Sequence, residues 1–222
     1  MTTAAGLLSG HFFKDSDMTQ ITIRDVSKRF ANGFEALKGV SVVIPAGSFT
    51  VILGSSGAGK STLLRTINGL ETPTFGTVQI GSETITKRNL QQIRAHVGMV
   101  FQQFNLVDRL SVMTNVLIGR LSQRSWLSSL LYMFRRADLD IAHAALNRVG
   151  LTDKAWSRAD KLSGGQQQRV GIARALAQQP RVILADEPVA SLDPVTSEEI
   201  MVLLREICTR DGLTVVVNLH QV

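Results

Sequence analysis

Residues 54–61 read Gly-Ser-Ser-Gly-Ala-Gly-Lys-Ser, and this stretch decides how the rest of the chain is interpreted. It matches the pattern G-x-x-x-x-G-K-[S/T] at every fixed position. A strand pattern at 49–53 precedes it, and a helical pattern at 60–68 follows it, with Gly69 as the predicted C-terminal cap. Glycines let backbone N–H groups point inward at a polyphosphate, and the helix N-terminus adds its positive end. Motif and context together favour a nucleoside triphosphate site over a glycine-rich turn that merely links strand to helix.

Two side chains of this loop have predicted roles. Lys60 would pair with the β- and γ-phosphates, and Ser61 would bind Mg²⁺. The predicted nucleotide-binding residues of the loop are Gly54, Ser55, Ser56, Gly57, Ala58, Gly59, Lys60, Ser61 and Thr62.

The composition is that of a folded domain. The chain has 222 residues, of which 44% are hydrophobic and 19% charged, so disorder as the main state is excluded. The one cysteine, Cys208, excludes a disulfide framework and a cysteine-rich metal site. No apolar run approaches the roughly 18 residues of a membrane span. The net charge of +6 suggests an anionic partner, either nucleic acid, a membrane surface or nucleotide, without choosing among them.

The order of patterns along the chain predicts an α/β fold. Short strand patterns at 21–24, 40–44 and 77–80 open the chain, and a strand is predicted at 97–101. After a helical stretch at 108–160, strands at 182–185 and 214–219 alternate with helices at 164–177 and 194–210. Such alternation predicts a parallel sheet covered on both faces, with an inserted helical subdomain at about 103–162. Residues 1–17 are expected to be a disordered leader, or to precede a true start at Met18, so one domain spans 18–222.

Two carboxylates form the second half of the predicted site. The apolar strand at 182–185 runs directly into Asp186 and Glu187. Ligands of α/β proteins bind at the carboxyl ends of the strands, so both side chains are expected beside the phosphate loop. Asp186 would bind Mg²⁺, and Glu187 would act as the general base on the attacking water. The alternative is a solvated acidic turn before Pro188. The presence of the phosphate loop favours a catalytic site over this alternative.

A second glycine-rich stretch, Leu-Ser-Gly-Gly-Gln-Gln-Gln-Arg at 162–169, precedes the helix at 164–177. Ser163 and Gln166 predict a capping box at its start. A capping box does not need Gly164 and Gly165. Because glycine has no side chain, these two residues would let the backbone lie very close to another group, either in the protein or in a ligand. This helix N-terminus is a second predicted anion site. Two chains arranged head to tail would use both sites, each ATP lying between the phosphate loop of one chain and residues 163–166 of the other.

These motifs, in this order, resemble the ATP-binding-cassette family over residues 18–222. The resemblance implies a P-loop core of the cassette type with an N-terminal antiparallel β subdomain, and ATP and Mg²⁺ as ligands. It implies that Gln102 contacts Mg²⁺ and water, that His220 contacts the γ-phosphate, and that Asp193 communicates across the dimer. Asp193 before Pro194 also fits a helix N-cap. Phe30 matches the aromatic residue that stacks on adenine; Phe34 is the competing position, and both also fit a role in the core.

Within the family, the transporter ATPases are favoured over three other kinds. Chromosome ATPases carry long coiled coils, repair enzymes carry zinc-binding cysteines, and ribosomal factors carry two cassettes; none of these features is in the sequence. The resemblance then implies a peripheral subunit at the cytoplasmic face of the bacterial plasma membrane. Its partners would be a second copy of itself, permease subunits and, indirectly, a binding protein, with no nucleic acid.

Three segments, 101–119, 183–194 and 214–222, resemble the ATP-binding subunits of phosphonate importers, with phosphite importers as near relatives. The alternatives are a polar amino-acid importer, or a nucleotide-binding module with little hydrolysis. The second alternative arises because cassette proteins normally continue with a strand and helices after the position of His220, which predicts a truncated chain.

The stretch 120–136 places Trp126 and four other apolar residues at helical spacing between arginines. A subdomain core helix with a solvated basic face is favoured over a contact surface for the permease or for lipid headgroups.

Overall fold

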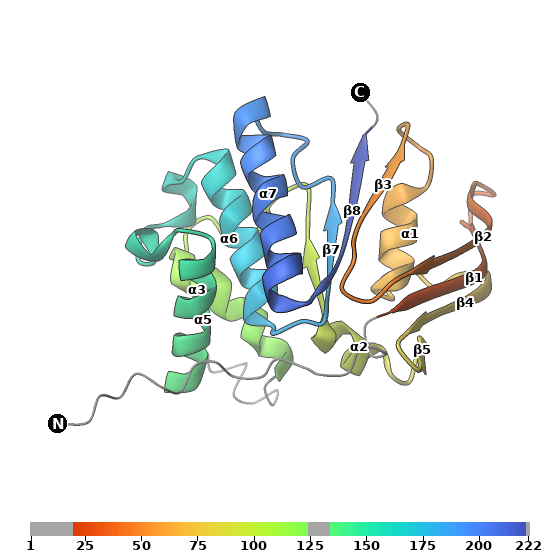
Figure 1. Cartoon of the computed structure of the whole chain (residues 1–222), viewed down its shortest axis with the longest axis horizontal. Coiled ribbons are helices and arrows are strands. Elements are labelled where there is room, and N and C mark those ends of the chain that lie inside the picture. Colours follow the sequence, from red (N-terminus) through yellow and green to blue (C-terminus); the bar gives the residue numbers. More distant parts are fainter. Residues whose placement is uncertain (1–19, 124–133, 221–222) are drawn as a thin grey trace.

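The computed structural model describes residues 20–123 and 134–220. Its centre is a parallel sheet in the order β3-β8-β7-β6 (Figure 1). The strands of this sheet are β3 (Phe49–Gly54), β8 (Thr214–His220), β7 (Val182–Asp186) and β6 (Val97–Val100). Because all four run in the same direction, their carboxyl ends meet at one edge, which is the upper edge in Figure 1.

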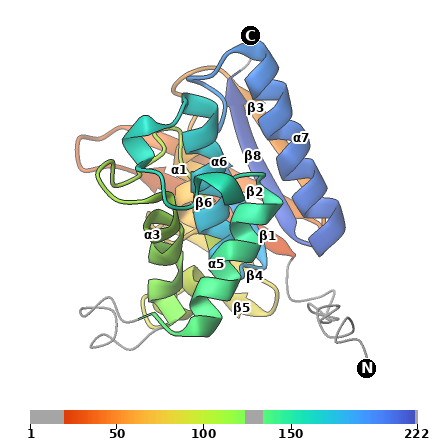
Figure 2. The ribbon, with the colours of Figure 1, turned by 90° about the vertical axis from the view of Figure 1, so that its left-hand side faces the viewer.

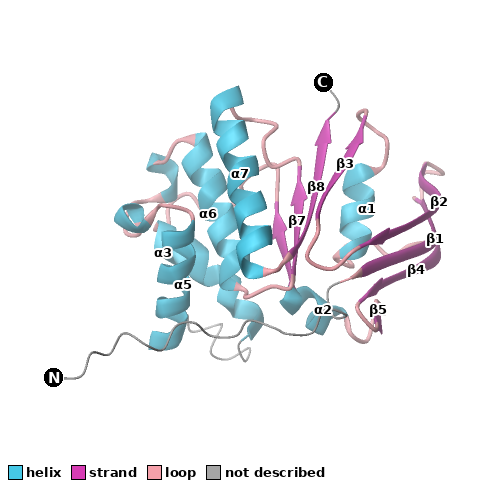
Figure 3. Ribbon diagram, viewed as in Figure 1, coloured by secondary structure: helices cyan, strands magenta, loops and turns pink. Residues whose placement is uncertain are grey.

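Alternate residues of the central strands enter two different cores. Val182, Leu184 and Val216 pack with the apolar side chains of helix α1 (Lys60–Ile67). Ile183 and Val215 pack on the opposite face, with helices α6 (Gly164–Ala177) and α7 (Pro194–Asp211). Figure 3 shows helices on both sides of these strands. The predicted parallel sheet with helices on both faces is therefore confirmed, and burial on both faces explains why residues 182–185 in β7 and 215–217 in β8 are continuous apolar runs.

A second, antiparallel sheet has the order β2-β1-β4-β5, and β3 of the first sheet lies between β2 and β4 in the chain. Its strands are β1 (Ile21–Arg29), β2 (Glu35–Ile44), β4 (Phe75–Ile80) and β5 (Glu83–Thr84). β1 and β2 are longer than predicted, because β1 changes register after Ile23 and Asp25 has a left-handed backbone with φ 46°. Such an irregularity breaks the period of two by which a strand is recognised.

The helical stretch predicted between β6 and α6 is present. Its described elements are α3 (Val112–Leu117), η2 (Ile118–Gln123), α5 (Arg136–Arg148), η3 (Thr152–Lys154) and η4 (Ala159–Lys161). Met113, Val116 and Leu146 are fully buried between α3, α5 and α6, which lie together in Figure 2. Arg120 is buried as well, so it is not part of a solvated basic face. Trp126 and the predicted leader at 1–17 lie outside the described residues.

The predicted helix at 164–177 has the expected bounds, and those at 60–68 and 194–210 differ by one residue. Gly69 follows α1 with φ 64°, as a C-terminal cap requires. Helix α2 (Leu90–His96) and strand β5 were not predicted, because each is too short to show a period. Within the described residues, none of the helices is long and apolar enough to cross a membrane.

Candidate active site

The phosphate loop joins β3 to α1 with a backbone that only glycine accommodates. Gly57 and Gly59 have φ of 78° and 84°, and a Cβ on Gly59 would lie 2.3 Å from the carbonyl oxygen of Ala36. Lys60 is 6% exposed, and its Nζ donates to the carbonyl oxygens of Gly54 (2.7 Å) and Ser55 (2.9 Å). No side chain caps α1 at Gly59. The loop thus has the backbone and the ammonium group that a polyphosphate requires.

Asp186 lies beside the phosphate loop, as expected, and its carboxylate contacts Ser61. The Ser61 hydroxyl donates to Asp186 Oδ1 at 2.7 Å, although the residues are 125 positions apart. The other carboxylate oxygen, Oδ2, lies 4.0 Å from the Arg65 guanidinium. Asp186 ends β7 on the face of the sheet that α1 covers, since Val182 and Leu184 on the same face pack with that helix. Strand order and side-chain alternation together bring the two motifs into contact.

Glu187 directly follows β7 and has a left-handed backbone with φ 50°. Its side chain reaches the neighbouring strand, where Oε1 lies 2.7 Å from Nε2 of His220. His220 ends β8 and is opposite Gly54 in the register of β8 with β3. The structure therefore gathers the phosphate loop, both carboxylates and the histidine at one edge of the sheet. A left-handed glutamate is uncommon, and such strain is often found at functional sites.

One residue of this edge was missed by the sequence analysis. Asn218 is completely buried in β8 and contacts both carboxylate residues. The available signal was a single amide within the apolar run Thr-Val-Val-Val-Asn-Leu-His at 214–220. A buried polar side chain in a central strand requires hydrogen-bond partners, and the functional motifs supply them here.

Gln102 lies two residues beyond the end of β6, which pairs with β7 through Val100 and Ala185. This register places it after a strand at the same edge as Asp186. Its side chain is exposed. The role predicted for Gln102 towards Mg²⁺ and water remains a prediction.

The second glycine-rich stretch forms a separate group at the starts of α6 and α7. Ser163 Oγ accepts from the Gln166 N–H (3.3 Å) and Gln166 Oε1 accepts from the Ser163 N–H (3.1 Å), which confirms the capping box. A Cβ on Gly165 would lie 2.4 Å from the Thr196 side chain, and one on Gly164 would lie 3.3 Å from that of Leu192. Within one chain, residues at and just before the start of α7 therefore take up the space that the two glycines leave open.

Asp193 caps α7, as its position before Pro194 predicted. Its Oδ1 accepts from the Thr196 N–H at 3.0 Å. Hydrogen bonds from Thr196 lower the pKa of the Asp193 carboxyl below its ordinary value. The capping role accounts for this side chain within one chain, and communication across a dimer stays a prediction.

Phe30 and Phe34 lie together where β1 turns into β2. Their rings are stacked, with centroids 6.5 Å apart, and Lys28 Nζ lies 5.1 Å from the Phe30 centroid. Phe30 is half-buried and Phe34 is 54% exposed, so neither belongs to the core. Two residues beyond Phe34, the Ala36 carbonyl meets Gly59 of the phosphate loop. Phe34 is thus two residues away from a carbonyl that lies against the loop, and its ring is accessible.

The donor atoms at this edge fit Mg²⁺. Ser61 offers a hydroxyl oxygen and Asp186 a carboxylate oxygen, and both are hard ligands. Among the described residues, no group of three or more His, Cys, Asp or Glu side chains could enclose a metal ion by itself. Two protein ligands that leave the remaining positions to phosphate and water are typical of Mg²⁺ sites in nucleotide enzymes.

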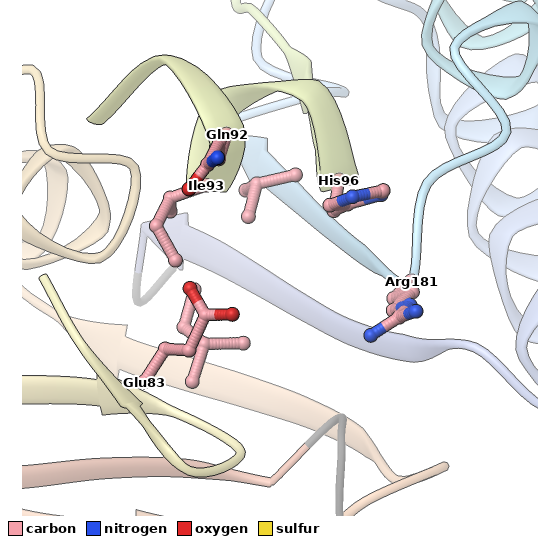
Figure 4. Close-up of a pocket in the computed structure, with 7 residues that line it drawn as sticks. Glu83, Gln92, Ile93, His96 and Arg181 are labelled. Atoms are coloured by element: carbon pink, nitrogen blue, oxygen red, sulfur yellow. The ribbon is translucent and has the colours of Figure 1, made fainter. Parts of the chain in front are cut away.

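A separate pocket of about 300 Å³ lies at the opposite end of the parallel sheet (Figure 4). Val97 and Arg181 line it at the starts of β6 and β7, together with Glu83 and His96. Burial, with Arg181 as a second cause, lowers the pKa of His96 below 6.5. This pocket is far from the phosphate loop along the strands and is not part of the nucleotide site.

Comparison with known proteins agrees with this geometry. The family model described as "ABC transporter" matches residues 37–190. The chain belongs to the ATP-binding-cassette transporter family, and its activity is ATP hydrolysis coupled to transport. It is 74% identical to the "Phosphonates import ATP-binding protein PhnC" of Thiobacillus denitrificans, over 92% of this chain and 79% of that protein. It is 55% identical to the "Phosphite import ATP-binding protein PxtA" of Stutzerimonas stutzeri, over 86% of this chain and 70% of that protein.

Solved structures give the same fold. The cassette MJ0796, described as a dimeric bacterial ABC transporter cassette, has a TM-score of 0.78 and 40% identity, over 90% of this chain and 88% of that chain. The cbiO1 protein of Clostridium perfringens has a TM-score of 0.79 and 30% identity, over 90% of this chain and 78% of that one. The cassette-type α/β fold predicted from the motifs is thereby confirmed.

Proposed function

We propose that this chain hydrolyses ATP to energise an importer of phosphonate or phosphite. The observation that carries the proposal is the 74% identity with a phosphonates import ATP-binding protein over 92% of the chain. A phosphite import ATP-binding protein at 55% identity supports the pairing of the two substrate classes. Both compounds are small phosphorus oxyanions that a permease, rather than the ATPase, would recognise.

Hydrolysis would take place at the carboxyl edge of the parallel sheet. Glu187 would orient and deprotonate the attacking water, and His220, at 2.7 Å, would hold its carboxylate towards the γ-phosphate. When ATP binds, the Lys60 ammonium group would leave the carbonyl oxygens of Gly54 and Ser55 and pair with phosphate oxygens. Ser61, Asp186 and Gln102 would hold Mg²⁺, which would supply positive charge beside the phosphates.

Two copies of the chain would form each complete site. The phosphate loop and the capped start of α6 belong to separate groups of residues within one chain. In a head-to-tail dimer, Ser163, Gly164, Gly165 and Gln166 of one copy would face the phosphate loop of the other and present a helix N-terminus to the γ-phosphate. Asp193 accepts a hydrogen bond from Thr196, whose side chain lies against Gly165. Asp193 would therefore lie at the same contact between the two copies. The dimeric structure of MJ0796, 40% identical, supports this assembly.

The remaining partners follow from the same kinship. The dimer would dock on two permease subunits at the cytoplasmic face of the plasma membrane, and an extracytoplasmic binding protein would deliver the substrate to the permease. Closure of the dimer around ATP would turn the permease outward, and hydrolysis would reset it.

Growth on defined phosphorus sources tests the proposal. Source cells lacking the gene would be complemented with the native protein, with Glu187→Gln, or with Glu206→Gln as a control. Glu206 is an exposed carboxylate on α7, outside the site. The native protein and the control should restore growth on phosphonate or phosphite, whereas Glu187→Gln should not. All strains should grow on phosphate.

Two outcomes would contradict the assigned substrate. Equal growth of the deletion strain on all three phosphorus sources would remove phosphonate and phosphite import as the function of this chain. A defect confined to a polar amino acid as sole nitrogen source would assign the chain to an amino-acid importer instead.

A further inference from the structure

Asn218 is a carboxamide that the structure buries among the residues of the site. It lies in β8, between Val217 and Leu219, and its exposed fraction is 0%. A buried carboxamide has one oxygen that accepts and an NH₂ group that donates, and each is costly to leave unsatisfied. The partners of Asn218 therefore show what holds it in the middle of an apolar strand.

The oxygen of Asn218 holds the backbone of Glu187. Oδ1 accepts the Glu187 N–H at 2.5 Å, across 31 positions of the chain. Glu187 needs such a restraint because its φ of 50° lies in the left-handed region, which a glutamate adopts only when its surroundings fix it. The bond fixes where the Glu187 side chain leaves the end of β7.

The nitrogen of the same carboxamide holds the residues that fit Mg²⁺. Nδ2 donates to Asp186 Oδ1 at 2.7 Å and lies 3.4 Å from Ser61 Oγ. Asp186 Oδ1 also accepts from the Ser61 hydroxyl, so two donors share this oxygen. With Oδ1 occupied by these donors, the carboxylate is fixed in rotation.

We propose that Asn218 is a positioning residue that couples the metal-binding pair, Ser61 and Asp186, to the general base Glu187. It does not touch the reacting atoms. Its carboxamide bonds both to the Asp186 carboxylate and to the Glu187 backbone. It therefore fixes the distance between the metal-binding residues and the general base. The proposal rests on ATP hydrolysis at this edge of the sheet.

Two substitutions at Asn218 separate positioning from folding. Asn218→Leu keeps the branching at Cγ and removes the hydrogen bonds to Glu187 and Asp186. Asn218→Asp keeps an oxygen for the Glu187 N–H but faces Asp186 with a second carboxylate in place of the donor. Each variant would be measured for kcat, for KM of ATP, for melting temperature, and for the gain in ATP affinity on adding Mg²⁺ in a binding assay without turnover.

Asn115 provides the matched control. It is also 0% exposed, its Oδ1 accepts from the Val107 N–H, and its Nδ2 donates to the carbonyl oxygens of Val107 and Ser111. It lies in α3, away from the phosphate loop. Asn115→Leu therefore removes an equally buried and equally bonded carboxamide without touching the site.

Both Asn218 variants should lower kcat by about 10–100-fold, as the loss of partners that orient metal ligands does. ATP affinity without Mg²⁺ should stay within about twofold, because the phosphate loop is intact. The gain on adding Mg²⁺ should shrink for Asn218→Leu. Asn115→Leu should lower the melting temperature while the kcat of the folded protein and the Mg²⁺ gain stay native.

Two results would overturn the proposal. The first is native kcat and native Mg²⁺ gain in either Asn218 variant. The second is a loss in Asn218→Leu that Asn115→Leu reproduces, since this would make Asn218 structural only. If Asn218→Leu does not fold, native values in Asn218→Asp remain decisive. An inactive wild-type chain would instead contradict the proposed function, and the Mg²⁺ gain would still test Asn218.

Discussion

Glu187 Oε1 lies 2.7 Å from His220 Nε2, so the residue that follows β7 is in direct contact with the residue that ends the neighbouring strand β8. The backbone of Glu187 is also fixed, because its N–H donates to Asn218 Oδ1. The expected general base is therefore fixed at both its backbone and its carboxylate. Replacing the Glu187 carboxylate with an amide of the same size should therefore remove the base while the shape of the site stays nearly the same.

Glu187→Gln should bind ATP and fail to hydrolyse it. The amide keeps the size of the side chain but cannot take a proton, so the rate should fall by about 10²–10⁴-fold. Phosphate release measures the rate, and light scattering with ATP measures the dimer, which should accumulate. Glu206→Gln serves as the control. Phosphate release at the native rate by Glu187→Gln would remove this residue as the base.

Phe30→Ala should weaken nucleotide binding, since a stacked base contributes about 1–3 kcal/mol and this corresponds to roughly a 5–150-fold change in Kd. Phe30→Tyr should retain the affinity, because an aromatic ring remains. Phe34→Ala keeps the Phe30 ring and should have a smaller effect. Equilibrium binding of a fluorescent ATP analogue measures all three. A larger loss in Phe34→Ala than in Phe30→Ala would assign the adenine contact to Phe34.

Arg120→Met should destabilise the fold strongly. The Arg120 guanidinium donates to Asp138 Oδ1 (3.2 Å), to the Ala177 carbonyl (2.8 Å) and to Gln179 Oε1 (3.1 Å), and the residue is 8% exposed. Removing one partner of a buried ion pair leaves the other charge uncompensated and costs about 3–5 kcal/mol. Urea unfolding measures the loss. Arg109→Met, at an exposed arginine, is the control, and equal stabilities of the two variants would contradict the prediction.

Stability should fall in mild acid through His96. Burial, and then Arg181, lower its pKa below 6.5, with Glu83 opposing them. The fold thus favours neutral His96, and this contribution is complete above pH 6.5 and is lost as the pH falls through the lowered pKa. Urea unfolding between pH 5 and 8 should therefore show a shallower decline for His96→Gln than for the native chain. Parallel curves would show that His96 does not contribute.

The sequence was most informative where several signals coincided. The phosphate loop had a motif, a preceding strand and a following helix, and the structure places Ser61 on Asp186 as expected. Strands β6 and β7 were recognisable because they are buried on both faces. β1 was partly missed because Asp25 interrupts its alternation.

Asn218 was missed for a different reason. Its function depends on residues 31 to 157 positions away, and a lone amide in a strand carries no local pattern that reveals them. The close approach at Gly165 was predicted, but its partner, Thr196, follows from the packing of α6 on α7 and from no motif.

The order of strands in the parallel sheet has a consequence for how the chain is made. β8 is the last described strand to be synthesised, yet it lies between β3 and β7. Until it leaves the ribosome, β3 lacks its neighbour in this sheet and β7 lacks one of two, which exposes backbone edges open to wrong pairing. Asn218 and His220 arrive with that same strand. The joining of β3 to β7 in one sheet and the assembly of the hydrolytic residues therefore depend on the same strand.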